Sequence, residues 1–194
     1  MAVQRLKQNI LDQGVALIMK QGYHGTGIQA ILQAVNIPKG SFYNYFSSKE
    51  EFGSQVIEHY IEPFIQQLNT HLNQPEIDAL TALRRYFMAL IDELEQKKYE
   101  GGCLLGNLMG EIGDTSELAR CALKRAVDRY RDALAAGLER AQREGQVRKD
   151  REAREMADLL INAWQGALLR MKIERSVKPL RQFMEEILSG FCRE

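Results

Sequence analysis

Apolar side chains recur along most of this 194-residue chain at the three- and four-residue spacing that places them on one face of a helix. No run of alternating polar and β-branched residues indicates a sheet. Glycine, proline and short polar breaks divide the pattern into about nine predicted helices, at residues 4–21, 26–35, 39–46, 48–72, 76–97, 103–112, 116–144, 151–174 and 179–191. The sequence therefore predicts an all-α fold.

Two of these helices are very short and are separated by a tight turn. The first has apolar residues at i, i+3, i+4 and i+7, namely Ile28, Ile31, Leu32 and Val35. Thr26 is a candidate N-cap for it, and Asn36 suits the left-handed position that ends a helix. Two short amphipathic helices joined in this way are typical of a helix-turn-helix.

The second short helix has two different faces. Winding residues 39–46 at 3.6 residues per turn puts Phe42 and Phe46 on one side and Gly40 and Asn44 on the other, next to Tyr43. We expect the phenylalanine side to pack on the protein and the opposite side to present hydrogen-bonding groups and an aromatic ring to a partner. The arrangement is typical of a helix that lies on nucleic acid.

At these residues the chain resembles the TetR family of bacterial repressors. The resemblance lies in the pair Gly22-Tyr23, in Thr26, in the Ile-rich helix, in the run K-G-S-F-Y-N-Y-F at residues 39–46 and in Lys49, in this order and spacing. It covers residues 4 to 60 and implies a three-helix DNA-binding domain at residues 1–48. It further implies a helical effector-sensing and dimerisation domain at residues 49–194, and a repressor rather than an enzyme.

The same resemblance implies which residues touch a double-stranded operator. Base edges or the groove floor are expected to contact Lys39, Gly40, Tyr43 and Asn44, and phosphates are expected to contact Thr26, Ser41, Tyr45 and Lys49. The residue types agree, because glycine permits close approach, asparagine pairs with adenine and hydroxyl groups suit phosphate oxygens. One head is too small for tight binding, so two heads are expected on a palindromic site, about 34 Å apart.

The charge distribution and the length of the apolar runs further narrow the class of protein. The whole chain has a formal net charge of zero, but residues 1–50 carry five basic and two acidic side chains, which favours a local polyanion-binding surface. No apolar run reaches the ~18 residues needed to span a bilayer, and no signal pattern opens the chain, so we expect a cytoplasmic protein.

The cysteines and histidines indicate neither a metal site nor a catalytic one. Cys103, Cys121 and Cys192 are too widely spaced for a disulfide framework or a CxxC metal site, so we expect free thiols. The three histidines lie far in sequence from every cysteine and lack zinc-ligand spacing. We therefore expect no metal, no cofactor and no catalysis.

The last two predicted helices are apolar around more than one stripe. One stripe is expected to pack on the body, and the second is either half-exposed or covered by the same helices of another copy. A two-fold four-helix interface would cover it. The family resemblance also implies a homodimer through these helices.

Cys103 opens the second informative segment. Gly102, Gly106 and Gly110 recur every four residues, which gives a short helix a bare stripe that admits either a neighbouring helix or a ligand. Cys103 falls in the predicted first turn, where free N–H groups stabilise a thiolate. The alternative is that this cysteine is simply a small buried apolar residue.

A G-C-L segment and a late K-I-x-R-S-x-x-P-L segment add a resemblance to the NemR branch of the TetR family. That branch implies a sensor of electrophiles or oxidants in which Cys103 is paired with Lys172. A second hypothesis stays open, in which a small apolar inducer binds non-covalently among aromatic residues. These are Tyr60, Phe64, Tyr86, Phe87 and Trp164, which equally fit a packed core.

Overall fold

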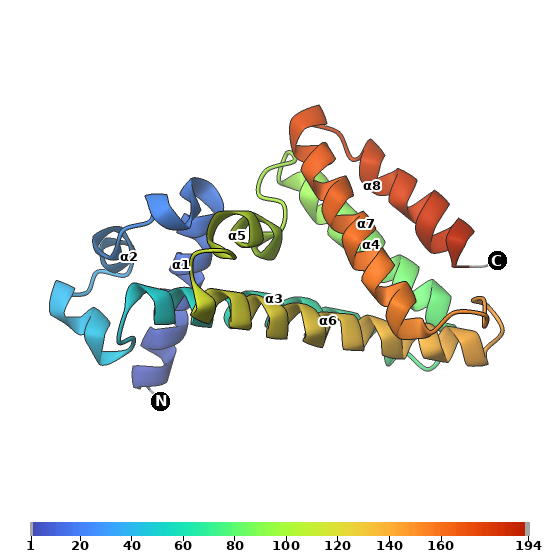
Figure 1. Cartoon of the computed structure of the whole chain (residues 1–194), viewed down its shortest axis with the longest axis horizontal. Coiled ribbons are helices and arrows are strands. Elements are labelled where there is room, and N and C mark those ends of the chain that lie inside the picture. Colours follow the sequence, from blue (N-terminus) through green and yellow to red (C-terminus); the bar gives the residue numbers. More distant parts are fainter. Residues whose placement is uncertain (1, 193–194) are drawn as a thin grey trace. The chain divides into compact units, whose positions relative to one another are not determined.

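The computed structural model describes residues 2–192, and within that range it contains helices and connecting turns but no strand (Figure 1). The all-α prediction is therefore confirmed. In chain order the elements are α1 (Ala2–Gly25), α2 (Ile28–Ala34), η1 (Lys39–Asn44), α3 (Lys49–Leu72), α4 (Ala79–Gln96), α5 (Leu104–Ile112), α6 (Glu117–Arg143), α7 (Ala153–Glu174), α8 (Lys178–Gln182) and η2 (Phe183–Phe191).

Contacts divide the chain into two compact units. The first joins the residues up to Pro63 to Leu104–Val127, and the second joins Phe64–Cys103 to the residues from Asp128 onward. Helices α3 and α6 contribute to both units. The predicted division into residues 1–48 and 49–194 rests on function and does not coincide with these contact units, so it stays a hypothesis.

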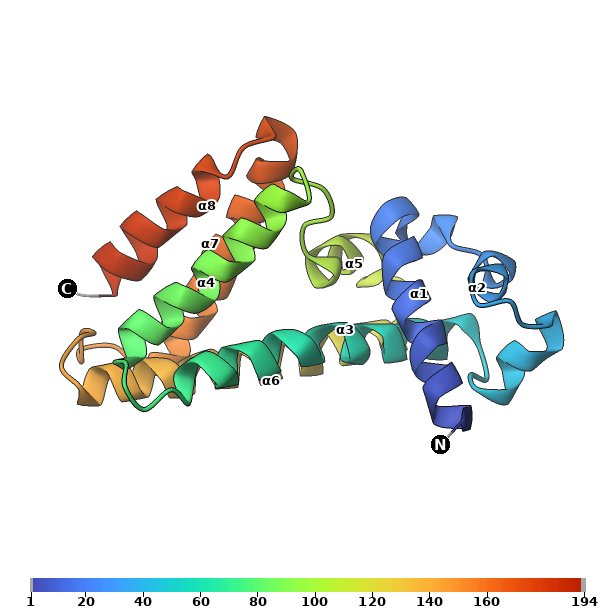
Figure 2. The same cartoon turned by 180° about the vertical axis from the view of Figure 1, so that it is seen from behind.

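The first unit is built around α1, which lies beside α5 in both views (Figures 1 and 2). Its buried face includes Ile10 and Ile18. Gly14 allows a close approach, because a Cβ there would lie 2.4 Å from the ring of Phe52. α1 breaks at Gly22, whose φ of 77° lies in the left-handed region that glycine tolerates best.

The second unit holds a core formed by α4, α7, α8 and η2 with the adjoining part of α6. Its centre is a triangle of rings, Phe87, Trp164 and Phe183, whose centroids lie 5.0 to 5.2 Å apart. Since tilted and edge-to-face pairs at this spacing are favourable, these side chains form a packed interior. Phe87 and Trp164 therefore belong to the core, which was one of the two interpretations open from the sequence.

Helix boundaries agree with the predicted ones to within a few residues, with two corrections. The predicted last helix at 179–191 begins as α8 at Lys178, with Pro179 in its first turn, and continues as the wider π-helix η2. The helix predicted at 76–97 begins only at Ala79, because the Asp78 carboxylate accepts the Thr81 N–H at 2.7 Å and caps it.

Candidate nucleic-acid interface and thiol site

The two-faced character predicted for residues 39–46 is present in η1. Phe42 and Phe46 are fully buried and pack with Phe52, at ring-centroid distances of 5.1 to 5.6 Å. On the other side Gly40 and Asn44 are exposed, and 60% of Tyr43 is accessible. Ser41 and Tyr45 are half-buried, and the Lys39 side chain lies outside the described residues.

The winding of this segment differs from the predicted α-helix. Residues 39–44 form a 3₁₀ helix, in which Ser41 N–H donates to the Pro38 carbonyl at 2.9 Å. Only the final turn restores the four-residue spacing, where Phe46 N–H donates to the Phe42 carbonyl at 3.1 Å. Glycine, serine, tyrosine and asparagine have modest helix propensity, so a short segment of them is held by the anchoring of its phenylalanines.

The turn between α2 and η1 agrees with the predicted helix-turn-helix. Asn36 has a φ of 55° and follows the C-cap residue Val35, which is the left-handed position expected for it. On α2 the buried residues are Ile31 and Leu32. The turn between α2 and η1 therefore depends on Asn36 and on residues next to it in the sequence.

Thr26 has a different position from the predicted one. Its side chain is fully buried, and its hydroxyl donates to the Gly22 carbonyl at 2.7 Å. It is not the N-cap of α2, because that residue is Gly27, which makes no side-chain cap. The Thr26 hydroxyl thus has a partner inside the first unit, and the phosphate contact expected for it stays a prediction.

Lys49 also points inward. Its Nζ donates to the Tyr23 carbonyl at 2.8 Å and lies 4.5 Å from the centroid of the Tyr23 ring. Burial lowers the pKa of this ammonium group, and the negative charge of Glu111 opposes that shift. The structure therefore brings Lys49 together with the α1 break, and the phosphate contact expected for it stays a prediction.

The start of α3 carries a modified capping box at Ser48 and Glu51. Ser48 Oγ accepts the Glu51 N–H at 3.0 Å. The Glu51 carboxylate, however, accepts from the N–H of Ser47 at 2.6 Å rather than from Ser48. The hydrogen bonds from Ser47 lower the pKa of the Glu51 carboxyl. This end of α3 is thereby fixed next to η1.

The predicted sensor cysteine lies in the second unit, directly before α5. Four of the five residues before it have a positive φ, namely Lys98, Tyr99, Gly101 and Gly102. Cys103 is half-buried, and its sulfur accepts a hydrogen bond from Gln165 Nε2 at 3.0 Å. Cys103 therefore lies just outside the helix rather than in its first turn, and its partner comes from α7.

Lys172 lies close to this cysteine but does not bond to it. Its side chain is exposed, and a Cβ added to Gly102 would meet Lys172 Cδ at 3.1 Å. Gln165 precedes Lys172 by seven residues, which puts both on one face of α7. The glycine before Cys103 thus lets the lysine stem pass, while the amide of Gln165 reaches the sulfur.

The second unit also holds a pair of phenols, Tyr86, which is buried, and Tyr130, which is half-buried. The hydroxyls of Tyr86 and Tyr130 lie 2.9 Å apart. Burial raises the pKa of Tyr86, the hydrogen bond with Tyr130 opposes the rise, and a negative charge at Cys103 adds to it. Cys103 is therefore within electrostatic reach of the Tyr86 hydroxyl.

Gly102 is in the loop before α5, so the predicted stripe of glycines does not run along one helix.

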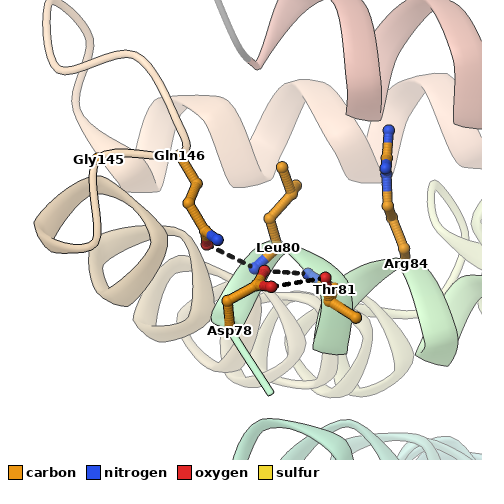
Figure 3. Close-up of a pocket in the computed structure, with 6 residues that line it drawn as sticks. All are labelled: Asp78, Leu80, Thr81, Arg84, Gly145 and Gln146. Carbon is orange, nitrogen blue, oxygen red and sulfur yellow. Dashed lines mark hydrogen bonds between the residues drawn. The ribbon is translucent and has the colours of Figure 1, made fainter.

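A polar pocket of about 370 Å³ opens at the start of α4 (Figure 3). Two of its lining residues satisfy the helix end, because Leu80 N–H donates to Gln146 at 3.3 Å. The Ala79 N–H of the same turn donates to the Glu144 carboxylate at 2.8 Å. Since carboxylates already occupy this N-terminus, an anionic ligand would meet like charge there. We regard the pocket as part of the capping of α4.

No group of three or more His, Cys, Asp or Glu side chains among residues 2–192 is placed to hold a metal ion. Over the same range, no helix combines the length and apolar character needed to cross a membrane.

Sequence reasoning missed two residues at these sites. Gln165 carries a weak signal, the seven-residue spacing from Lys172, that could have identified it. Glu111 carries none: its carboxylate accepts the N–H groups of Tyr23 and His24, 88 and 87 residues earlier in the chain. Only the fold brings them together.

Known proteins resemble this chain over nearly its whole length. Residues 10–54 match the family described as bacterial regulatory proteins, tetR family, and residues 79–187 match the tetracyclin repressor-like C-terminal domain. The HTH-type transcriptional repressor DhaR of Mycobacterium sp. strain GP1 is 35% identical, over 98% of this chain and 94% of that protein.

The repressor NemR of Escherichia coli strain K12 is 29% identical, over 93% of this chain and 91% of that protein. The crystal structure of reduced E. coli NemR superposes with a TM-score of 0.87, covering 94% of this chain and 95% of that one. A regulatory protein TetR from Rhodobacter sphaeroides gives 0.86 at 30% identity, covering 94% and 97%. Because DhaR is more similar in sequence than NemR, the comparisons do not single out the NemR branch.

Proposed function

The chain belongs to the TetR family of DNA-binding transcriptional repressors, and on this premise we propose that it is a homodimer that leaves a palindromic operator when Cys103 is modified. The reading surface would be the exposed face of η1, with Gly40, Tyr43 and Asn44 at the DNA and Ser41 and Tyr45 at its edge. The single observation that carries the DNA assignment is the contrast across η1. Tyr43 is 60% exposed although Phe42, its neighbour, is fully buried.

A stripe on α7 supports dimerisation. Leu159, Asn162, Gly166, Leu169 and Ile173 are all exposed, and their spacing of three and four residues repeats over two heptads. Ile173 is 82% exposed, which is unusual for so large an apolar side chain. A Cβ on Gly166 would meet nothing within 4 Å, so a second helix can approach closely at that point.

The occupant we propose is α7 of a second copy, because a self-complementary stripe meets itself across a two-fold axis. Replacing Leu169 by Glu would place charges together at the interface. We expect a monomer in analytical ultracentrifugation and loss of operator binding. Leu118→Glu is the matched control, since Leu118 is an exposed leucine of α6, 43% accessible, in the other unit. A Leu169→Glu protein that stays dimeric would contradict the assignment.

The thiol switch is supported by the surroundings of Cys103. The Gln165 amide donates to the Cys103 sulfur, and the lysine stem at Gly102 brings a cation to the same region. In the reaction with a maleimide, the thiolate forms a C–S bond to the ring, and water supplies the proton for the adjacent carbon. The product carries no charge on sulfur, so the interactions that hold the loop before α5 would change.

The test uses the DNA upstream of the protein's own gene, labelled with a fluorophore, and N-ethylmaleimide as the electrophile. We expect the probe to weaken operator binding by wild type but not by Cys103→Ser, while Cys121→Ser responds as wild type does. Peptide mapping should leave Cys192 unmodified, since burial raises the pKa of that thiol to about 11. If Cys103→Ser still responds, the thiol is not the sensor, and the non-covalent inducer hypothesis takes its place.

A further inference from the structure

The break in α1 at Gly22 leaves two backbone donors without a partner in their own helix. With φ 77° and ψ 169°, Gly22 directs the next two N–H groups away from the preceding turn. The Glu111 carboxylate accepts both of them, from Tyr23 at 2.9 Å and from His24 at 2.7 Å. A carboxylate that takes two N–H groups at a helix start forms charge-assisted bonds in a favourable dipole.

The carbonyl groups of the same break are held by residues of the helix-turn-helix region. Thr26 donates its hydroxyl to the Gly22 carbonyl at 2.7 Å, and Lys49 donates its Nζ to the Tyr23 carbonyl at 2.8 Å. A Cβ on Gly22 would lie 3.0 Å from a Glu111 oxygen, so glycine is needed for this approach. The break is thus fixed from one side by the reading head and from the other by Glu111.

Glu111 belongs to α5, and α5 begins at the residue that follows Cys103. The helix buries Leu104, Leu105, Leu108 and Ile112, so it is closely packed along its length. Seven residues of helix separate Leu104 from Glu111, a rise of about 10 Å. Any displacement of the segment before α5 would therefore reach the α1 break through a short rigid helix.

We propose that Glu111 is the positioning residue through which α5 sets the geometry of the DNA-reading head. Its carboxylate fixes the Gly22 break, and the break fixes where α2 begins, only three residues after Gly25. Two experiments test this inference. The experiment without an effector, its effector-free arm, measures operator binding alone. The experiment with a thiol reagent, its effector arm, rests on the proposed function, in which modification of Cys103 weakens operator binding.

The effector-free arm compares Glu111→Ala with Asp114→Ala, an exposed carboxylate in the turn after α5. We expect Glu111→Ala to weaken operator binding about tenfold and to speed hydrogen exchange at the Tyr23 and His24 amides, with the helical content close to wild type and the melting temperature only a few degrees lower. The operator affinity of Glu111→Gln, which keeps one acceptor oxygen, should lie between the affinities of Glu111→Ala and wild type. Asp114→Ala should match wild type. Wild-type affinity in Glu111→Ala would overturn the inference.

The effector arm measures operator affinity before and after N-ethylmaleimide. The ratio in wild type should fall in the range typical of allosteric coupling, about 5- to 150-fold, and should approach 1 in Glu111→Ala. A fold-stabilising role alone would change affinity but not this ratio. If both proteins respond equally, the inference fails and the thiol switch stands. If wild type does not respond, the thiol switch fails and the effector-free arm decides about Glu111.

Discussion

Single substitutions at two neighbouring residues of η1, Phe42 and Tyr43, can distinguish an effect on folding from an effect on DNA binding. Phe42→Ala removes a fully buried ring that has three aromatic neighbours, Tyr43, Phe46 and Phe52, at centroid distances of 5.2 to 5.6 Å. Truncation of a buried phenylalanine costs about 3–5 kcal/mol. At about 2–4 °C per kcal/mol for a chain of this size, the melting temperature should fall by roughly 6–20 °C.

Tyr43→Ala acts on the opposite face. Since 60% of the side chain is exposed, its removal should change stability by less than about 0.5 kcal/mol. If each head loses one hydrogen bond to a base edge, at about 0.5–1.5 kcal/mol, a dimer loses about 1–3 kcal/mol of binding. That corresponds to a drop in operator affinity of about 5- to 150-fold.

Circular dichroism would give the melting curves, and fluorescence anisotropy with upstream DNA at physiological salt would give the affinities. The reasoning about the two faces is wrong if Phe42→Ala melts with wild type. The DNA assignment is wrong if Tyr43→Ala folds normally and binds as tightly as wild type. Lys49→Ala is unsuitable as a pure DNA-contact variant, because its Nζ bonds the Tyr23 carbonyl and its removal would disturb the head.

Two further predictions concern stability. Gly102→Ala should destabilise the protein by about 1–2 kcal/mol, because φ is +84° and the new Cβ would lie 3.1 Å from Lys172, whereas Gly110→Ala, with open space in mid-helix, should stabilise it by about 0.5–1 kcal/mol. Urea denaturation of both variants checks this, and equal effects would contradict it. The hydrogen bond from the Ala79 N–H lowers the pKa of Glu144, with burial opposing and Arg140 assisting. Its contribution to stability is therefore present above about pH 4.5 and is lost as the pH falls through the folded-state pKa. Glu144→Gln should cost about 1 kcal/mol at pH 7 and converge with wild type as the pH falls through the folded-state pKa of Glu144, and a difference that does not change with pH would refute the assignment.

Local sequence information was sufficient where neighbouring residues determine the outcome. The helical period, the left-handed Asn36 and the Gly22 break depend on residues within one or two turns, so each follows from the sequence. The division of η1 into a buried and an exposed face has the same origin, because Phe42 and Phe46 are joined by a four-residue hydrogen bond even though the rest of the segment is a 3₁₀ helix.

The tertiary structure decided which polar groups meet. Thr26 and Lys49 look like phosphate ligands in sequence, yet both satisfy carbonyl groups of the α1 break, and the partner of Cys103 is Gln165 rather than Lys172. Glu111 reaches the same break from 88 residues away. A buried or half-buried polar group needs a hydrogen-bond partner. Spacing in the sequence indicates which partners are possible within one helix. The packing of the helices determines which residues of other helices become partners. The sequence by itself therefore determined the helices and their faces, while the fold determined the internal contacts that connect the reading head to α5.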